Sequence, residues 1–295
     1  MDNVFYKDDP EYPKLLKETK GAPKQLYYKG SWDKEIFKNC LAVVGSRRLT
    51  SYGQRIVQDL VEELAGAGLT IVSGFMYGGD AMAHQAALNG GGQTIAVMPC
   101  GIERIHPAYQ KKLYQEILNN KGLIISEYQG DSQPVLWTYP QRNRIVAGLA
   151  KAVLVLEAGP KSGSLITASY AKKFKRKVFA VPGPIISRLS EGTNLLIKEG
   201  AEMVLSARDI LKYYRSHSVI SSRFTLKGSD ASQKFRNARF EGLEKKIFEL
   251  LEREPLGIDE LSRQLEISVS ELGTKLSLMQ IKGLISQTGN KYYVN

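Results

Sequence analysis

Three short turns rich in glycine and serine each follow an apolar segment of this chain and lead into a segment with helical periodicity. The turns are residues 45–48, 73–74 and 162–164. A turn between a strand and a helix leaves backbone N–H groups unpaired at the positive end of the helix dipole. Such groups bind phosphate and other anions. Because parallel strands end at the same edge of a sheet, we expect the three turns to form one site for an anionic ligand.

The side chains in and after these turns indicate how an anion would be held. Arg47 is the first candidate, because a guanidinium on such a loop can donate two hydrogen bonds to one phosphate. Gly45 lets a ligand approach the backbone closely, and Ser46 can donate its hydroxyl. The alternative for Arg47 is an ion pair with a buried carboxylate such as Asp80. The further candidate contacts are Ser73, Gly74, Gly78, Lys161, Ser162, Gly163, Ser164 and Thr167.

None of the three turns matches the GxGxxG or the Walker pattern, so the sequence predicts no dinucleotide, no triphosphate and no cofactor. Asp80 and His84 lie four residues apart on a predicted helix, a spacing that could serve acid–base or metal chemistry. Since no third residue has the spacing of a metal ligand, we interpret the pair as structural. We therefore predict no catalytic and no metal-binding residue.

The elements that must position these residues alternate along residues 41–214. Apolar segments predict buried strands at residues 41–44, 70–73, 94–98, 123–126, 152–156 and 178–181, with a short one near 203–205. Amphipathic segments predict helices at residues 51–65, 80–89, 108–119, 141–149, 164–174, 192–199 and 207–214. This alternation is typical of an α/β fold with a doubly wound, mostly parallel sheet that is covered on both faces.

Three further segments flank the predicted α/β domain. Residues 1–40 form a lead-in, with a short edge strand at residues 25–28. Residues 215–240 are rich in serine and basic residues and predict a flexible linker, which is either only solvated or touches DNA backbone. Residues 241–295 predict a small winged-helix domain with three helices and a hairpin.

Seven segments together resemble the DprA/Smf family, bacterial DNA-processing proteins of natural transformation. They are residues 45–53, 73–88, 94–107, 139–150, 155–171, 178–184 and 191–201. The resemblance runs in order from about residue 5 to residue 214 and continues into the winged-helix segment. It implies an extended Rossmann domain, single-stranded DNA binding, a homodimer and, without enzymatic activity, protection of incoming DNA and loading of the RecA recombinase. The apolar helices near residues 191–214 would form the dimer edge.

The same resemblance adds residues to the candidate DNA site. Tyr139 stands where the family commonly has Phe, so its ring could stack on a base, with packing at the helix start as an equal alternative. Arg142 is expected to contact DNA, whereas Arg144 is expected to brace the crowded loops. The sequence departs from the family pattern at Met76, Gly79 and Leu136. Gly79 is expected to loosen its turn, and Leu136 replaces a lysine contact of the family.

The charge balance favours a polyanionic partner. The chain has 295 residues, a net charge of +11 and an isoelectric point near 9.4. Residues 241–295 carry seven Lys and Arg against nine Asp and Glu, a net charge of −2, so residues 1–240 carry +13. We therefore expect the main DNA surface on the α/β domain, and a protein contact for the winged helix. A basic run at residues 173–177 is interpreted as a solvated helix end.

Other features predict a cytoplasmic protein. The first residues are polar and acidic, unlike a signal peptide, and no apolar run approaches the length that spans a membrane. Cys40 and Cys100 have neither metal-ligand nor disulfide spacing, so we expect both to be buried as small apolar residues.

Two other functions fit the sequence less well. The first is a nucleotide-processing hydrolase on the same fold, for which Glu157, at the end of its strand, is the only obvious catalytic acid. The turn after that strand lacks the PGGxGT pattern of such hydrolases. The second is a regulator that binds duplex DNA through its winged helix.

Overall fold

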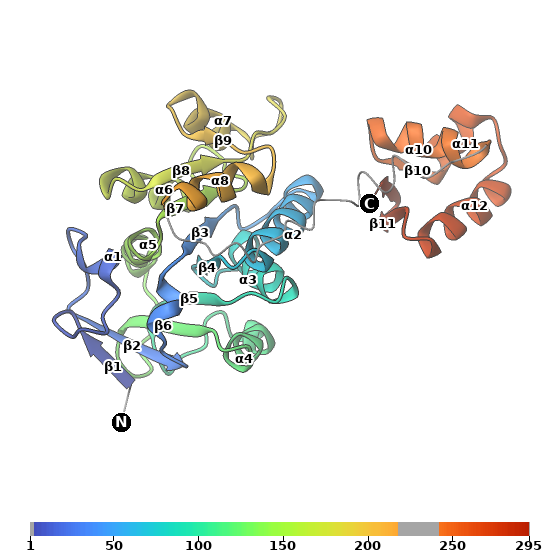
Figure 1. Ribbon diagram of the computed structural model, residues 1–295. Coiled ribbons are helices and arrows are strands. Elements are labelled where there is room, and N and C mark those ends of the chain that lie inside the picture. The colour runs from blue at the N-terminus through green and yellow to red at the C-terminus, as the bar shows by residue number, and fades with distance from the viewer. Residues whose placement is uncertain (1–2, 218–241, 295) are drawn as a thin grey trace. The chain divides into compact units, whose positions relative to one another are not determined.

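The chain divides into two compact units, residues 1–221 and 222–295. The computed structural model describes residues 3–217 of the first unit and residues 242–294 of the second (Figure 1). Residues 218–240, most of the predicted linker, lie outside the described residues. The three residues before them form the end of a helix instead of a linker.

The larger unit is built on one nine-stranded sheet. Its strands lie in the order β1–β2–β6–β5–β4–β3–β7–β8–β9. The strands are β1 (Asn3–Tyr6), β2 (Gln25–Gly30), β3 (Cys40–Val44), β4 (Thr70–Ser73), β5 (Thr94–Gly101), β6 (Leu123–Tyr128), β7 (Ala152–Val155), β8 (Lys177–Ala180) and β9 (Glu202–Met203). The β1–β2 and β2–β6 pairs are antiparallel, and the other neighbouring pairs are parallel. The predicted mostly parallel sheet is confirmed.

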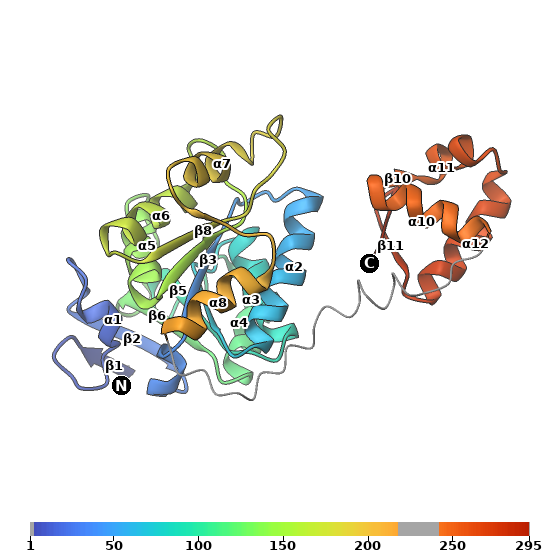
Figure 2. The same cartoon turned by 45° about the horizontal axis from the view of Figure 1, so that its top comes forward.

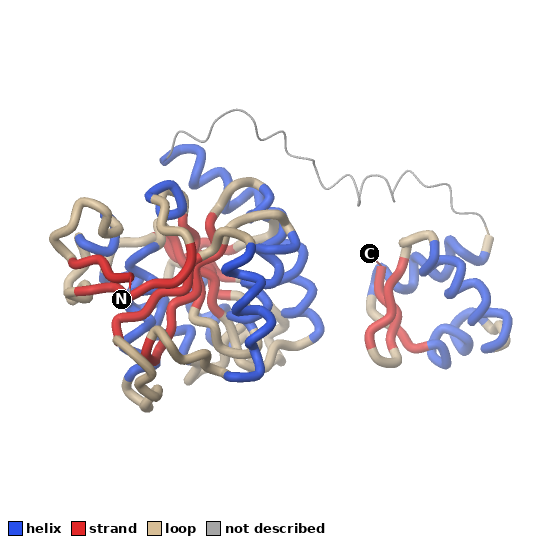
Figure 3. The backbone as a smooth tube through the Cα atoms, turned by 90° about the horizontal axis from the view of Figure 1, so that it is seen from below, coloured by secondary structure: helices blue, strands red, loops and turns tan. Residues whose placement is uncertain are grey.

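Helices cover this sheet on both faces (Figures 2 and 3). The helices are α1 (Lys14–Lys17), α2 (Ser51–Gly66), α3 (Gly79–Asn89), α4 (Lys111–Asn119), α5 (Thr138–Leu149), α6 (Gly163–Lys173), α7 (Glu191–Lys198) and α8 (Ala207–His217), with short 3-10 helices η1 (Lys34–Phe37) and η2 (Ala108–Gln110). On one face α3 packs against α2 and α4, and α8 packs against α2. On the other face α5 packs against α1 and α6.

Successive residues of β5 belong to two separate apolar cores. Ile95 and Val97 pack in the same cluster as Ile145 of α5, whereas Ala96 and Met98 pack on the other face, with residues of α4. Because side chains alternate between the two faces of a strand, a strand that is buried on both faces must be apolar throughout. This is why uninterrupted apolar segments in the sequence predicted the central strands.

The lead-in segment joins the same sheet. β2 pairs with β6 on one side and with β1 on the other, so the prediction that it is an edge strand is wrong. β1 is the edge strand, and its four residues are too short an alternation to predict a strand from the sequence. Leu16, Leu26 and Ile36 are buried in the same core as the residues of α5.

The order of the strands reverses beside β3. From β3 the chain adds β4, β5 and β6 on one side, and it then adds β7, β8 and β9 on the other. The loop after β3 leads to α2 and the loop after β7 leads to α6, on opposite faces of the sheet. The two loops therefore diverge at the carboxyl ends of the strands, and ligands of open α/β sheets bind in the crevice at such a point.

The smaller unit has the arrangement of a winged helix, as predicted. It consists of α10 (Leu243–Arg253), β10 (Leu256–Gly257), α11 (Ile258–Leu265), α12 (Val269–Ile281), β11 (Ile285–Thr288) and β12 (Lys291–Val294). The strands form an antiparallel sheet in the order β10–β12–β11. Ser268 caps α12, because its side chain accepts a hydrogen bond from Glu271 N at 3.3 Å. The apolar core gathers residues of all three helices and of the strands.

Both cysteines are free and buried, as expected, and burial raises the pKa of Cys40 to about 12 and that of Cys100 to about 11. Neither thiol is therefore ionised near neutral pH. Among residues 3–217 and 242–294, the helices are all too short or too polar to cross a membrane.

Candidate nucleic-acid interface

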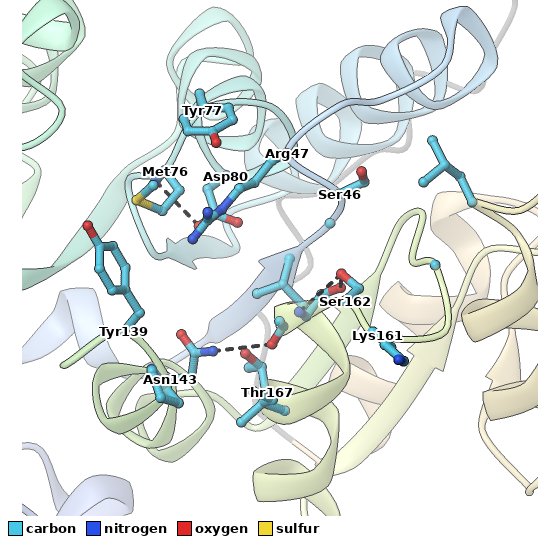
Figure 4. A pocket seen from close by; sticks show the side chains of 18 of the residues that line it. Ser46, Arg47, Met76, Tyr77, Asp80, Tyr139, Asn143, Lys161, Ser162 and Thr167 are labelled. Atoms are coloured by element: carbon cyan, nitrogen blue, oxygen red, sulfur yellow. Dashed lines mark hydrogen bonds between the residues drawn. The ribbon is translucent and has the colours of Figure 1, made fainter. Parts of the chain in front are cut away.

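A pocket of about 680 Å³ lies at the switch point beside β3. It is lined by the turn after β3, the turn before α3, the start of α5 and the loop between β7 and α6 (Figure 4). Most of the predicted contact residues line it: Gly45, Ser46, Arg47, Tyr139, Arg142, Lys161, Ser162, Gly163, Ser164 and Thr167. The fold therefore brings the turns after β3 and β7 together, although they are far apart in the sequence.

Arg47 extends from the turn after β3 toward two tyrosines. Its guanidinium carbon lies 5.5 Å from the ring centre of Tyr77 and 5.7 Å from that of Tyr139. The ring faces hold this cation in place without neutralising it. Arg47 and Asp80 form no salt bridge in the described part of the chain, although the charges of Arg142 and, to a lesser degree, of Arg47 lower the pKa of Asp80. Arg47 is thus an exposed cation at the pocket, with no ion pair to any residue that the structure describes.

The hydroxyl of Ser46 is used within its own turn, which corrects its predicted role as a donor to phosphate. It donates to Arg48 O at 3.0 Å and accepts from Arg48 N at 3.0 Å. The residue is also buried. Ser46 therefore shapes the turn that carries Arg47.

Gly79 brings the start of α3 against the turn after β3. Its N–H donates to Ser46 O at 2.9 Å, and a Cβ at this position would lie 2.9 Å from Gly45 Cα. The expectation that Gly79 loosens this turn is wrong, because the missing side chain permits close contact between the two backbones. Gly78, at a φ of 79°, faces the carbonyls of Ser46 and Arg47, so it supports the pocket without lining it.

Ser73 and Gly74 lie behind the pocket, so the prediction that they contact phosphate is wrong. Ser73 is completely buried, and its hydroxyl donates to Val43 O at 2.6 Å. A Cβ at Gly74 would lie 2.5 Å from the guanidinium carbon of Arg142. Other parts of the chain therefore fill the space beside both residues.

The N-terminus of α6 faces the pocket. Ser162 caps this helix, since its Oγ accepts from Ser164 N at 3.4 Å and lies 2.6 Å from Ser164 Oγ. Lys161 is exposed beside the cap, and the space around Gly163 is open. Asn143 Nδ2 donates to Gly163 O at 3.2 Å and so ties α5 to α6 (Figure 4). The first turn of α6 can thus present backbone donors and one cation to a ligand.

Arg142 and Arg144 both have structural partners, which was expected of Arg144 but not of Arg142. Arg142 is only 3% exposed, and its Nη1 donates to Gly74 O and Val97 O. Its predicted contact with DNA is therefore wrong, because its guanidinium joins the residue after β4 to the middle of β5 at the edge of the pocket. Arg144 pairs with Glu127 at 2.6 Å and holds α5 against the end of β6.

Asp80 and His84 have structural partners. Burial raises the pKa of Asp80, whereas Arg142 and a hydrogen bond from Met76 N lower it. His84 is completely buried with its Nδ1 2.6 Å from Thr94 Oγ1, and burial lowers its pKa to about 3. In the part of the chain that the structure describes, no group of three or more His, Cys, Asp or Glu residues could hold a metal ion. These contacts support the structural interpretation of both side chains.

The carboxylate of Glu157 points toward the start of α2 and does not line the pocket. Its Oε2 accepts from Thr50 N at 2.9 Å, and its Oε1 accepts from the hydroxyl of Thr50. That hydroxyl in turn accepts from Gly53 N at 3.1 Å. Glu157 is thus only 2% exposed and caps the N-terminus of α2. It is not free to act as the acid that a hydrolase would need.

Several residues of the pocket were not predicted from the sequence. Tyr77 provides the second ring beside Arg47, and an aromatic residue in a glycine-rich turn was an available signal for it. Arg188, in the loop after β8, also lines the pocket. No local pattern marks Arg188, because only the strand order brings its loop to this place. Leu136, one of the three departures from the family pattern, is 91% exposed at the same pocket.

Comparisons with known proteins agree with this arrangement. The family model of DNA recombination-mediator protein A matches residues 3–215, and that of the DprA winged helix domain matches residues 236–291. The chain is similar to Protein Smf of Synechocystis sp., with 34% identity over 97% of this chain and 78% of that protein.

Two solved structures are similar in fold and sequence. One is DNA processing protein A (DprA) from Streptococcus pneumoniae, with 42% identity, a TM-score of 0.68 and coverage of 72% of this chain and 74% of that chain. The other is DNA processing protein A from Helicobacter pylori, which was described for its single-stranded DNA binding mode. It shows 32% identity and a TM-score of 0.65, and covers 74% of this chain and 99% of that chain.

Proposed function

Because this chain belongs to the DNA recombination-mediator protein A family, which includes DprA and Smf proteins, we propose that it binds single-stranded DNA in the pocket beside β3. The observation that carries this proposal is the state of Arg47. Its guanidinium is exposed, lies between the rings of Tyr77 and Tyr139, and has no ion pair within the described residues. A cation held beside aromatic rings suits a chain of alternating phosphates and bases.

The pocket offers separate contacts to the two parts of a nucleotide. Arg47, Lys161 and the N-terminal N–H groups of α6 provide positive charge and donors for phosphates. Tyr139 and Tyr77 provide ring faces for bases, and every base can stack on such a face. Binding of this kind tolerates many sequences and weakens with salt, as expected for a protein that handles arbitrary strands.

The family relationship supports a wider role in recombination. We propose that the protein protects incoming single strands and loads the RecA recombinase onto them, as a homodimer, during natural transformation. Exposed apolar residues near α7 and β9 suit contact with a second copy, since Leu195, Met203 and Leu205 are 52%, 46% and 75% exposed. A dimer would place two pockets on one strand and so raise the affinity for long DNA.

A binding role, without catalysis, agrees with the surroundings of Glu157. Both of its oxygens accept hydrogen bonds from Thr50, so this carboxylate is committed to the start of α2. The winged-helix unit carries a net charge of −2 over residues 241–295. That charge favours a contact with protein over tight binding of duplex DNA.

Fluorescence anisotropy with a labelled oligo-dT strand and a matched duplex tests the proposal across a series of salt concentrations. We expect a preference for the single strand that Arg47→Ala strongly reduces. The matched control is Lys111→Ala, which removes one exposed cation of α4 outside the pocket. Duplex binding that equals or exceeds single-strand binding, and that Arg47→Ala leaves unchanged, would overturn the assignment of the site. Failure to bind any DNA would overturn the proposal itself.

A further inference from the structure

A second hollow with a positive lining lies at the other end of α6 from the pocket. This groove has a volume of about 630 Å³. One carboxylate, that of Glu18, and four cations line it. The cations are Lys20, Lys173, Lys175 and Arg176. From the sequence, the basic run at residues 173–177 is interpreted as a solvated helix end. In the structure, three cations of that run line a groove together with the loop after α1.

Two cations of the groove lack the carboxylate partners that their neighbours in the chain have. Lys172 pairs with Glu199 at 2.8 Å, and Lys177 pairs with Glu202 at 2.7 Å. Within the part of the chain that the structure describes, Lys173 and Lys175 form no ion pair. Stabilisation of the α6 dipole would explain cations at the end of this helix, but it would not explain Lys20, which comes from a distant segment.

Two aromatic rings lie among these charges. Tyr170 and Phe174 are stacked, with ring centres 5.8 Å apart and planes inclined by 26°. Lys173 Nζ lies 5.5 Å from the ring centre of Tyr170. A groove that combines cations with aromatic faces has the two features that bind single-stranded nucleic acid, namely charge for the phosphates and rings for the bases.

One face of α6 connects the pocket to the groove. Ile166 lines the pocket and is 40% exposed, while Tyr170 and Lys173 line the groove. Residues separated by four and by three positions lie on the same face of a helix. The pocket lining on α6 ends at Thr167 and the groove begins at Tyr170, so the two sites are about 4.5 Å apart along the helix axis.

We propose that this groove is a second binding site for the same single strand of DNA, which leaves the pocket and follows α6 to reach Lys20, Lys173 and Lys175. The inference rests on the proposed function of the pocket. It predicts that short strands use the pocket alone and that longer strands use both sites. The experiment must therefore compare strands of two lengths.

The test uses the full chain with Lys173→Gln and Lys175→Gln combined, because glutamine keeps most of the side chain and removes the charge. The matched control combines Lys111→Gln and Lys121→Gln at α4, on the other face of the sheet. The match is close, because Lys175 and Lys121 each follow a helix at a positive φ, 57° and 59°. Binding of oligo-dT strands of about 4 and about 16 nucleotides, which bracket common single-strand site sizes, is measured across a salt series.

For the groove variant we expect the affinity for the long strand to fall several-fold and the affinity for the short strand to stay unchanged. The slope of log affinity against log salt should fall by about 1.4 for the long strand, since each lost phosphate contact contributes about 0.7. The control variant should match the wild type, and Arg47→Ala should weaken both strands. A long strand that carries a photoreactive base should also crosslink to the peptide that contains Tyr170 and Phe174.

Each other outcome separates the two proposals. An unchanged affinity and salt slope for the long strand in the groove variant overturns the second site while the pocket stands. Binding of polyglutamate is measured in parallel as a probe for an acidic protein. If the groove variant loses polyglutamate binding that the wild type has, and keeps its DNA binding, the groove is a site for an acidic protein and the proposal is overturned. A wild-type protein that binds neither strand overturns both sites.

Discussion

The guanidinium of Arg142 donates through Nη1 to the carbonyl of Gly74, at the edge of the pocket. The same nitrogen donates to Val97 O, so one buried side chain joins the residue after β4 to the middle of β5. The charge of Arg142 also lowers the pKa of Asp80, which burial raises. A buried cation thus ties β4 to β5 beside the pocket that the exposed cation Arg47 also lines.

Replacement of Arg142 by alanine should destabilise the larger unit by about 3–5 kcal/mol, because it leaves two carbonyls and the carboxylate of Asp80 without their buried partner. Urea unfolding measures the change. The matched control is Arg104→Ala, which breaks a partly exposed pair with Asp131 and should cost about 1 kcal/mol or less. An Arg142→Ala protein that is as stable as this control, but binds no DNA, would show that Arg142 contacts DNA after all.

The substitution Glu157→Gln separates a helix cap from a catalytic acid. We expect a loss of about 1–3 kcal/mol in unfolding free energy, because the amide group cannot accept both hydrogen bonds from Thr50. Single-strand affinity should stay close to that of the wild type. Glu116→Gln, in an exposed pair with Lys112, serves as the control. Nucleotide hydrolysis by the wild type that disappears in a fully stable Glu157→Gln protein would favour the hydrolase instead.

Two substitutions of Tyr139 decide between base stacking and packing. If the ring stacks on a base, Tyr139→Ala should weaken single-strand binding by about 1–3 kcal/mol. Tyr139→Phe should keep most of the affinity. Phenylalanine retains the ring face beside Arg47 and loses only the contact of the hydroxyl with His106 Nε2, which is 2.9 Å long. If the ring serves packing alone, Tyr139→Ala will lower thermal stability and leave the affinity unchanged.

His84 should make stability depend on pH. Its pKa is about 3 in the folded protein, below the ordinary value of 6.5, so the unfolded chain binds more protons between these values. Stability from this group is complete above about pH 6.5 and is lost as the pH falls toward 3, by on the order of 4 kcal/mol. Chemical unfolding at several pH values, compared with His84→Leu, measures the effect. Parallel curves for the two proteins would contradict it.

The central strands were predictable because they are buried on both faces and therefore read as continuous apolar segments, as in β7 and β3. The edge strand β1 was not, because its pairing with β2 depends on a partner and not on its own pattern. Charge patterning was misleading at Arg142, since a local sequence shows that an arginine is present but not whether the chain folds over it.

By itself, the sequence determined the type of fold, the turns that could bind an anion and the family, because these depend on local periodicity and on residues close together in the chain. Only the tertiary structure decided which charged side chains stay free for a ligand. Arg47 lies exposed between two rings, while Arg142 and Glu157 are consumed by backbone groups far away in the sequence. The reason is physical: hydrogen bonds and burial are set by neighbours in space, and the strand order chooses those neighbours.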